Sequence, residues 1–469
     1  MVEGRKGGRG NWEGVLWFGV SLVVLLLAAQ GSFYKADAQR LVLRLTNGDL
    51  QYPHHKLYLP LLYGFSQLLA PLKLSPFQLA RAFSALGVAM GVAFSFASFR
   101  RLGANLKISR LSTLGTLSVP TVFFFGTTVE LHGPFFGFAG FSIWIWAWLV
   151  ERARQQRGTL LPALLLGGST ALASGVHASG MILPALLLPW FLALRWKKPG
   201  PKLLPMGLFL ASHGLLLLLF ANPGHSVDFL QEGFHHPTGI RELPGIFWYE
   251  FLWPFFPYSL SLFLALRIKS ARAEVLALLV ALLPYLLGAL RLIAGDPEFG
   301  AYLIPLAPLA AYLSCRALGI WALFLLLPAF GVQHSIREIF DQKDAYQVRV
   351  QGLRRATGNK PSLLLIGDPE EFSAFLAQAP AYRLFPLDLV AKIRLEDFPS
   401  ALQSLDHKLH AEWAKGEQVL LTGGGRAYLE DPRKTLEKGP LLLKFLQSRY
   451  QLLPRRAKGF EAWLLRPKK

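Results

Sequence analysis

Cysteine and charged residues are both scarce in this sequence. Cys315 is the only cysteine among 469 residues, so the chain can form no intramolecular disulfide and has no cysteine cluster for a metal. Charged residues make up 17% of the chain, against about 25% in a typical soluble domain. Acids are the scarcer sign, with 29 Asp and Glu against 49 Lys and Arg. These shortages exclude a disulfide scaffold and disfavour a single soluble core.

Apolar residues are abundant instead, at 52% of the chain. Leu-rich runs recur from residue 13 to about residue 332, and each is close to the roughly 20 residues that cross a bilayer core. Short charged or Gly/Pro-containing breaks separate these runs. The pattern predicts an all-α polytopic membrane protein up to residue 333.

The N-terminus combines a basic start with an apolar run, as a signal peptide does. Other apolar runs follow it, which favours an uncleaved first helix with residues 1–12 as a basic cytoplasmic N-terminus. The "AAQG" after the run keeps cleavage open as the alternative.

Charge sign alternates along the breaks between the apolar runs. The breaks "FRRLGANLKISR", "ERARQQR", "RWKKPGPK", "RIKSAR" and "CRALG" are all basic, whereas "GTTVELHG", "SGVHASG" and "AGDPEFG" are poor in Lys and Arg and contain acids and histidines. Basic loops stay on the cytoplasmic side of a membrane. The alternation predicts about eleven spans in the cell membrane, with the C-terminal domain outside.

The predicted spans follow from these breaks. They are 13–31, 77–99, 107–127, 134–151, 159–176, 179–195, 203–221, 247–266, 274–294, 300–315 and 318–333. Residues 32–76 form the first outer loop, in which "KLYLPLLYGFSQLLAPLKL" is too short and too rich in Pro to span. We expect this segment to be a helix along the outer interface, with its tyrosines at headgroup depth.

Residues 334–469 change to alternating strand and helix patterns. "SLLLIG", "EQVLLTGGG" and "FEAWLLRP" are typical of strands, and "DPRKTLEKGPLLLKFLQSR" of a helix. "DPEEFSAFLAQ" predicts another helix with Asp368 as its N-cap. Together they predict a small extracytoplasmic α/β domain.

The net charge of +20 could indicate nucleic acid as a partner. The basic residues cluster at the ends of apolar runs, however, where membrane topology places them. We therefore interpret the charge as topology and contact with anionic lipid, and expect no nucleic acid.

Ionisable groups near a membrane are costly, so each is a candidate for function. They collect at the predicted outer ends of the spans and are Asp37, Asp49, His54, His55, Lys56, Glu130, His132, His177, Arg291, Asp296 and Glu298. For any one of them a solvated loop position is an equal alternative.

The first outer loop carries a recognisable order of residues. Asp37 follows the first span, "RLVLRLTNGDL" comes next, and "PHHKLYLPLLY" completes the loop. This order resembles the integral-membrane glycosyltransferases of the GT-C fold, which take sugars from polyprenyl-phosphate carriers. It looks most like lipid A aminoarabinose transferases and protein O-mannosyltransferases, although Ala38 stands where members often have a second acid.

The resemblance implies a reaction and roles for these residues. Asp37 would take the proton from an acceptor hydroxyl as general base. Arg40, His54, His55, Lys56 and Arg291 would hold the lipid phosphate that leaves. No cofactor is required in this scheme, and a divalent cation stays open as an addition. The acceptor, whether protein, glycolipid or polysaccharide, and the sugar are left open.

Several structural alternatives accompany these roles. Asp37 could only cap the helix "AQRLVLRL", and His54 and His55 could rest among lipid headgroups. Glu130 and His132 could cap the next helix, and His213 is expected to make an interhelical hydrogen bond. "TGGG" lacks the Lys-Ser/Thr of a P-loop and is expected to be a plain turn.

Two other functions compete with the enzyme. A transporter or flippase for a lipid or solute would show inverted repeats and charges near the bilayer midplane. No clear internal repeat is present, and the ionisable groups lie at one face. A non-catalytic scaffold would tolerate replacement of all the outer charges.

Overall fold

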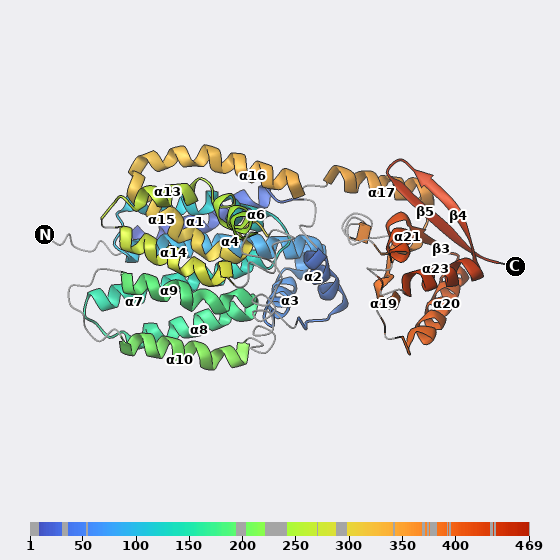
Figure 1. The fold of residues 1–469 in the computed structure, drawn as a ribbon, viewed down its shortest axis with the longest axis horizontal. Coiled ribbons are helices and arrows are strands. Elements are labelled where there is room, and N and C mark those ends of the chain that lie inside the picture. Colours follow the sequence, from blue (N-terminus) through green and yellow to red (C-terminus); the bar gives the residue numbers. More distant parts are fainter. Residues whose placement is uncertain are drawn as a thin grey trace. The chain divides into compact units, whose positions relative to one another are not determined.

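The computed structural model describes most of the chain (Figure 1). The described residues are 9–30, 36–52, 55–193, 203–220, 242–269, 271–287, 298–340, 343–367, 371–372, 375, 382–391, 393, 395–431, 435 and 438–468. Contacts divide the chain into two compact units. The first comprises residues 1–30 and 40–339, and the second comprises residues 31–39 and 340–469.

The first unit is a bundle of helices (Figure 1). Its helices are α1 (Arg9–Leu27), α3 (Tyr58–Leu68), α4 (Pro76–Arg101), α5 (Leu106–Ser118), α6 (Pro120–Thr127), α7 (His132–Arg154), α8 (Leu160–Val176), α9 (Leu183–Ala193), α10 (Leu203–Phe220), α12 (Leu243–Phe247), α13 (Tyr258–Ala265), α14 (Arg272–Leu287), α15 (Ala307–Leu318) and α16 (Leu326–Phe340). Short turns of other helix types are η1 (Ala70–Leu72), η2 (Ala178–Ile182), η4 (Trp248–Leu252), η6 (Ala301–Leu306) and η7 (Gly319–Leu325). The amphipathic helix α2 (Ala36–Asn47) lies across the division between the units.

Glycines bring α4 and α7 together along the middle of the bundle. A Cβ on Gly87 would lie 2.4 Å from the Pro134 Cα, and one on Gly140 would lie 2.7 Å from the Gly91 Cα. Small residues spaced four apart, as Gly87 and Gly91 are, allow helix backbones in membranes to approach closely. The extensive contact between α4 and α7 follows from this spacing.

The helix starts agree well with the predicted spans, but eleven spans are not confirmed. Among the described residues, three helical stretches are long and apolar enough to cross a membrane: Pro76–Arg101, His132–Arg154 and Ala301–Glu338. The span expected at 107–127 is instead a pair of helices, α5 and α6, bent by 60° at Pro120. The span expected at 247–266 is broken between α12 and α13, where Pro254 and Pro257 interrupt the helical hydrogen bonds.

The segment expected to be an interfacial helix is α3 with η1. Within this segment, Tyr58 is completely buried inside the protein. Tyr63 remains 40% exposed. Packing of α3 against α4 explains the difference, since Tyr58 contacts the Phe83 ring at 5.7 Å between centroids.

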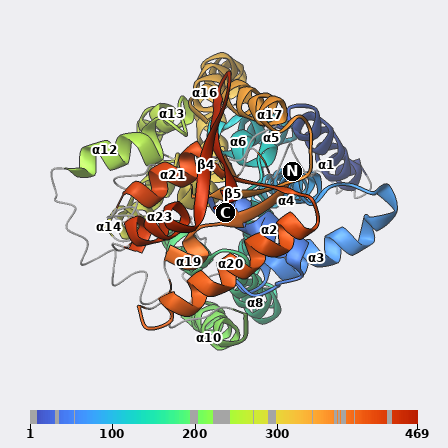
Figure 2. The same ribbon diagram turned by 90° about the vertical axis from the view of Figure 1, so that its right-hand side faces the viewer.

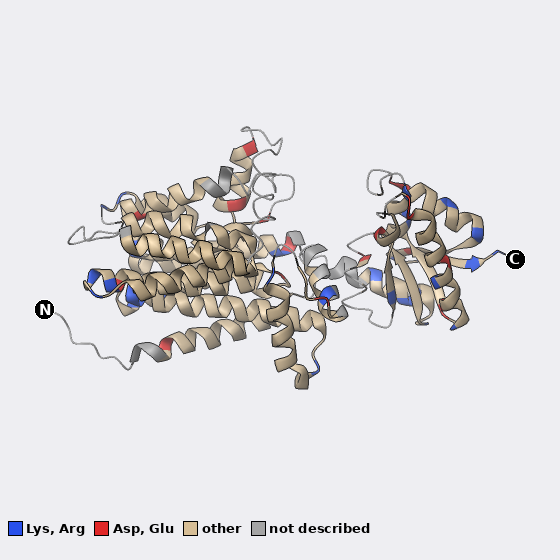
Figure 3. Cartoon of the chain, turned by 90° about the horizontal axis from the view of Figure 1, so that it is seen from below, with Lys and Arg blue, Asp and Glu red and all other residues tan. Residues whose placement is uncertain are grey.

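The alternation of charge along the sequence corresponds to a difference in Lys and Arg content between the two ends of the bundle. Lys and Arg gather at one end, where α4 and α7 finish (Figure 3). There Arg101 pairs with Glu151 at 2.8 Å, and Arg154 donates to the Leu102 carbonyl. The opposite end contains His132 and His177, which are described below.

The second unit contains a five-stranded sheet. The strands are β1 (Ser362–Ile366), β2 (Arg383–Pro386), β3 (Gln418–Thr422), β4 (Tyr450–Ala457) and β5 (Phe460–Pro467), in the order β2-β1-β3-β5-β4. The β2, β1 and β3 strands are parallel, whereas β5 and β4 are antiparallel neighbours. The helices are α17 (Lys343–Thr357), α19 (Asp388–Ala391), α20 (Phe398–Ala414), α21 (Gly423–Glu430) and α23 (Lys438–Arg449).

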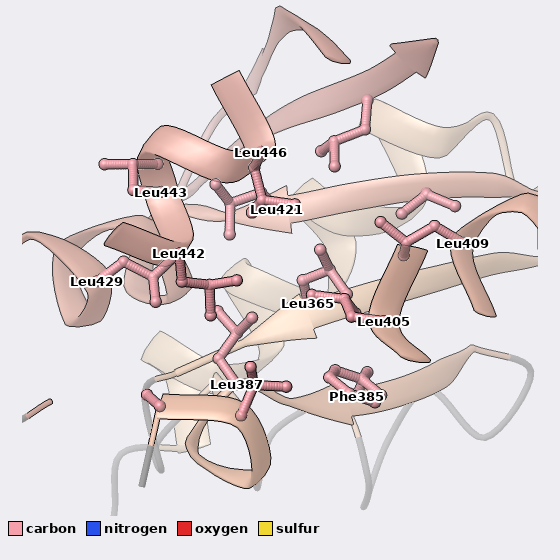
Figure 4. Close-up of a cluster of buried hydrophobic side chains, with 14 of the residues drawn as sticks. Leu365, Phe385, Leu387, Leu405, Leu409, Leu421, Leu429, Leu442, Leu443 and Leu446 are labelled. Carbon is pink, nitrogen blue, oxygen red and sulfur yellow. The ribbon is translucent and has the colours of Figure 1, made fainter. Parts of the chain in front are cut away.

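Helices cover both faces of this sheet, and Figure 2 shows its strands with the helices around them. Leu363 and Leu365 of β1 join a core with residues of α19, α20, α21 and α23, part of which is drawn in Figure 4. Leu364 and Ile366 point to the opposite face, where they pack with α17 and Phe375. Strand side chains alternate between faces, so the fully apolar "SLLLI" fits a strand buried on both sides.

The predicted strands in this unit are present as β1, β3 and β5, and part of the predicted helix at 431–449 is α23. Strands β2 and β4 and helix α20 were not predicted. Asp368 lies outside the described residues. The expectation of a plain turn at "TGGG" is wrong: the stretch is the start of α21, where the Thr422 hydroxyl caps the helix by accepting from the Gly425 amide at 3.0 Å.

Candidate functional site

Three histidines from separate segments meet at one end of the bundle. They are His55 just before α3, His132 at the start of α7 and His177 after α8, and we call them the histidine cluster. The His177 ring stacks on His55 at 4.6 Å and lies 4.5 Å from His132, between centroids. His132 and His177 are each only 4% exposed. The sequence predicted all three as candidates, and the structure brings them together.

Two of these rings are held by consecutive backbone amides. His55 Nδ1 accepts from the Ala178 amide at 3.3 Å, and His177 Nδ1 accepts from the Ser179 amide at 3.2 Å. The Ser179 hydroxyl also bonds His177 Nδ1. A nitrogen that accepts from an N–H carries no proton, so Nδ1 is the accepting nitrogen of both rings.

A carboxylate adjoins the cluster. Glu130 is 3% exposed, and its Oε2 lies 3.8 Å from His132 Nδ1. Oε2 also accepts from the Leu131 amide at 2.5 Å, while the Ser84 hydroxyl donates to the Glu130 carbonyl at 2.9 Å. Glu130 therefore binds the amide of Leu131, the N-cap residue of α7, but no side chain caps the helix, so the capping alternative is not realised.

Burial controls the ionisation of the groups around Glu130. Burial, helped by the neighbouring His132, lowers the pKa of His177 well below its usual value. Burial also raises the pKa of Tyr58, and the negative charge of Glu130 adds to that effect. No hydrogen-bond partner for the Tyr58 hydroxyl lies within the described part of the chain.

Five predicted residues have side chains outside the described part of the structure. Two of them, Asp37 and Arg40, lie in α2. Because α2 already includes Ala36, Asp37 is within the helix and not at the capping position before it. His54, Arg291 and Asp296 lie outside the described residues altogether.

Other candidates have contacts of their own. The Lys56 ammonium donates to the Leu219 carbonyl at 3.0 Å, near the end of α10. Asp49 pairs with Arg44 at 3.0 Å and accepts from the Gln51 amide at 3.0 Å. These bonds hold the Asp49 carboxylate in the turn after α2 and give it a structural role there.

Glu250 binds the backbone amide of Glu298 and was not among the predicted residues. That amide donates to Glu250 at 2.7 Å, and the Gly300 amide donates to the same carboxylate at 2.9 Å. Glu250 is 1% exposed and so fastens η4 to the segment before η6. A carboxylate inside the apolar run "IFWYEFLW" was the signal that would have identified it.

Arg81 was also missed, although it stands inside the expected span 77–99. Its guanidinium donates to the Gln30 carbonyl at 2.7 Å, and the Gln30 amide donates to the Thr127 carbonyl at 2.8 Å. These bonds connect the ends of α1, α4 and α6. The rule that charges within spans are functional candidates applies to Arg81 as well.

In the second unit, the glycine-rich start of α21 was the stretch considered as a phosphate site. The Gly424 amide at the start of α21 donates to Glu371 at 3.3 Å, so a protein carboxylate already binds the backbone amide that a phosphate would otherwise bind.

Among the residues that the structure describes, no group of three or more His, Cys, Asp or Glu could hold a metal ion.

The fold of the chain is similar to that of a solved membrane enzyme. No family model and no curated protein matches the sequence. The structure is similar to that of ArnT from Cupriavidus metallidurans, a lipid A aminoarabinose transferase of GT-C fold, bound to undecaprenyl phosphate. The TM-score is 0.57 at 13% identity, and the match covers 98% of each chain.

The apo form of the same ArnT gives a TM-score of 0.52 at 12% identity, covering 96% of this chain and 97% of that one. The fold resemblance predicted from the first outer loop is thus confirmed over nearly the whole chain. Identity this low defines the fold alone.

Proposed function

We propose that the protein is a membrane glycosyltransferase that moves a sugar from a polyprenyl-phosphate donor to an acceptor. The observation that carries this proposal is the fold similarity, over nearly the whole chain, to an ArnT that was crystallised with undecaprenyl phosphate. The gathering of buried ionisable groups at one end of the bundle supports it, because glycosyl transfer from a lipid phosphate needs a base and phosphate ligands.

The reaction in this proposal forms one bond and breaks another at the anomeric carbon. Asp37 takes the proton from the acceptor hydroxyl, whose oxygen attacks that carbon while the lipid phosphate leaves with the bonding electron pair. Arg40, Lys56 and Arg291 stabilise the charge that grows on the phosphate, together with His54.

Lys56 and His55 can contribute while keeping their observed contacts. An ammonium has three N–H donors, so the bond from Lys56 to Leu219 leaves two for phosphate. His55 accepts through Nδ1, so in this proposal its part is to donate to the phosphate through Nε2.

The proposal includes no metal, because a sugar phosphate linked to a lipid is already activated and cations of the chain can neutralise the leaving group. It places the reaction on the outer side of the cell membrane. The C-terminal domain is proposed to lie on that side and to position the acceptor.

The function is tested by incubating the full chain in vesicles with isotope-labelled polyprenyl-phosphate sugars. We expect mass spectrometry to find the labelled sugar on a new covalent product, with turnover unchanged by a chelator. Label that crosses the vesicle membrane without entering any product would support a transporter or flippase instead and overturn the proposal.

Asp37→Asn tests the base. Loss of general-base catalysis should reduce turnover by about 100-fold or more, while expression and thermal stability stay near those of the wild type. Asp49→Asn is the matched control, since it removes the same charge from the same loop at a carboxylate occupied by Arg44 and Gln51. Equal turnover in Asp37→Asn and the wild type would remove Asp37 from the mechanism.

A further inference from the structure

An apolar groove lies at the end of the bundle that is opposite the histidine cluster. Its volume is about 730 Å³, and α1, α4 and α7 form its walls. Ser84 of α4 contacts Glu130 beside the cluster. From Ser84 along that helix, the groove lining begins at Met90, a rise of about 9 Å, and ends at Arg100 and Arg101, a rise of about 24 Å or more. No residue of the histidine cluster lines it. The groove is therefore separate from the site described above.

The walls of the groove are mostly apolar and its mouth is charged. Val15, Phe18, Met90, Ala93 and Phe94 are among the lining residues. The mouth is lined by Arg100, Arg101 and Glu151, together with the Trp144 ring. A pocket of this size falls within the range of about 300–1,000 Å³ that is typical of ligand sites.

Two ion pairs fix the helices that form the walls. Arg101 of α4 pairs with Glu151 of α7 at 2.8 Å and lies over the Trp144 ring, 5.0 Å from its centroid. On the other side, Arg110 of α5 donates to both carboxylate oxygens of Glu13 on α1, at 3.1 and 2.8 Å. Because each wall is tied to a neighbouring helix, the groove is a built feature of the bundle.

Arg100 supplies the charge that a ligand would meet. It is exposed and donates to the Ala104 carbonyl at 2.6 Å, and no carboxylate pairs with it among the described residues. Glu151 is already occupied by Arg101. The mouth therefore presents an unneutralised guanidinium directly above an apolar groove, which complements a ligand with an anionic head and an apolar tail.

We propose that this groove binds an anionic glycerophospholipid of the surrounding leaflet. One acyl chain lies between α1 and α7 against Ala93 and Ala97, and the headgroup phosphate binds Arg100. Trp144 and Trp148 suit this depth, because tryptophan prefers the boundary between acyl chains and headgroups. The site goes beyond the proposed sugar transfer, and its test measures lipid retention and not turnover.

The test is native mass spectrometry of the detergent-purified full chain. The chain is incubated with equal amounts of dioleoyl phosphatidylglycerol and dioleoyl phosphatidylcholine. We expect preferential retention of phosphatidylglycerol. Arg100→Gln should reduce that preference by about fivefold, the effect of one Arg near an anionic lipid surface. Arg157→Gln is the matched control, because Arg157 is exposed beyond the end of α7 and does not line the groove.

A second variant fills the groove. Ala93→Phe with Ala97→Phe should lower retention of both lipids, whereas Ala211→Phe, at an exposed alanine of α10, should leave it unchanged. Equal retention of the two lipids by the wild type, or an unchanged preference in Arg100→Gln, would overturn the proposal even if the filled variant does not fold. Undecaprenyl phosphate displacing phosphatidylglycerol in the wild type but not in the filled variant would also overturn it, because the groove would then take the polyprenyl carrier.

Discussion

At the scale of single residues, the histidine cluster combines a structural role with chemistry. His55 and His177 accept from consecutive amides, those of Ala178 and Ser179, at the turn where α8 gives way to η2. A buried amide must find an acceptor, and these rings provide two. The same bonds fix Nδ1 of each ring as an acceptor and so fix the orientation of both rings.

Protonation of His177 would remove one of these acceptors, which predicts a dependence of stability on pH. The folded state lowers the pKa of His177 below the value of about 6.5 in an unfolded chain. Below that pH the unfolded chain takes up a proton that the folded chain does not, so the free energy of unfolding should fall by up to about 1.4 kcal/mol per pH unit on acidification. Above about pH 6.5 this contribution should be constant.

Thermal unfolding in detergent between pH 5 and 8 measures this effect. His177→Asn should reduce the acid-induced loss, because Asn does not titrate in this range. His334→Asn is the control: that side chain is 72% exposed on α16 and should keep the wild-type dependence. A wild-type slope in His177→Asn would show that the buried ring does not stay neutral.

At the scale of elements, the contact between α4 and α7 decides where the histidine cluster can form. Gly87→Ala would place a Cβ 2.4 Å from the Pro134 Cα and 2.6 Å from the Gly133 carbonyl oxygen, so the two backbones would have to separate. Overpacking of this kind costs about 1–3 kcal/mol. We expect a lower unfolding temperature, together with weaker glycosyl transfer, because Pro134 lies two residues from His132.

Gly207→Ala on α10 provides the comparison, since nothing lies within 4 Å of its added Cβ. That change should leave stability the same or raise it by up to about 1 kcal/mol through helix propensity. Equal effects of the two substitutions would contradict the close approach of α4 and α7.

The elements also show what the sequence could and could not predict. Apolar length and basic breaks located the starts of α4, α7 and α8 within two residues, because each span must begin at a polar boundary. The bend at Pro120 was missed, since a proline within an apolar run is compatible with both a straight span and a broken one.

Partners distant in sequence were beyond this kind of prediction. The burial of Tyr58 depends on where α3 packs, and the role of Glu250 depends on amides about 50 residues away. The histidines were identifiable as candidates from their places at helix ends. That they stack on one another was not, because no local pattern records which helix ends are neighbours. The interhelical role predicted for His213 is confirmed by its bond to the Thr170 hydroxyl at 2.9 Å.

At the scale of the whole molecule, we predict an orientation in the membrane from the separation of charge between the ends of the bundle. The end with Arg100, Arg101 and Arg154 has the excess of basic residues that marks a cytoplasmic face. The histidine cluster would then face the outer side, where the proposed donor and acceptor meet.

Cysteine labelling can decide this orientation, because the chain has one cysteine, Cys315, and it is buried. With Cys315→Ser as background, Asp228→Cys should react with a membrane-impermeant maleimide in intact cells, because Asp228 lies in the predicted outer break between the spans 203–221 and 247–266. Arg157→Cys, at the basic end, should react only after the membrane is permeabilised. The reverse pattern would place the histidine cluster in the cytoplasm. The proposed transfer would then have to draw its polyprenyl-phosphate donor from the inner leaflet, and the anionic lipid of the groove would come from the outer one.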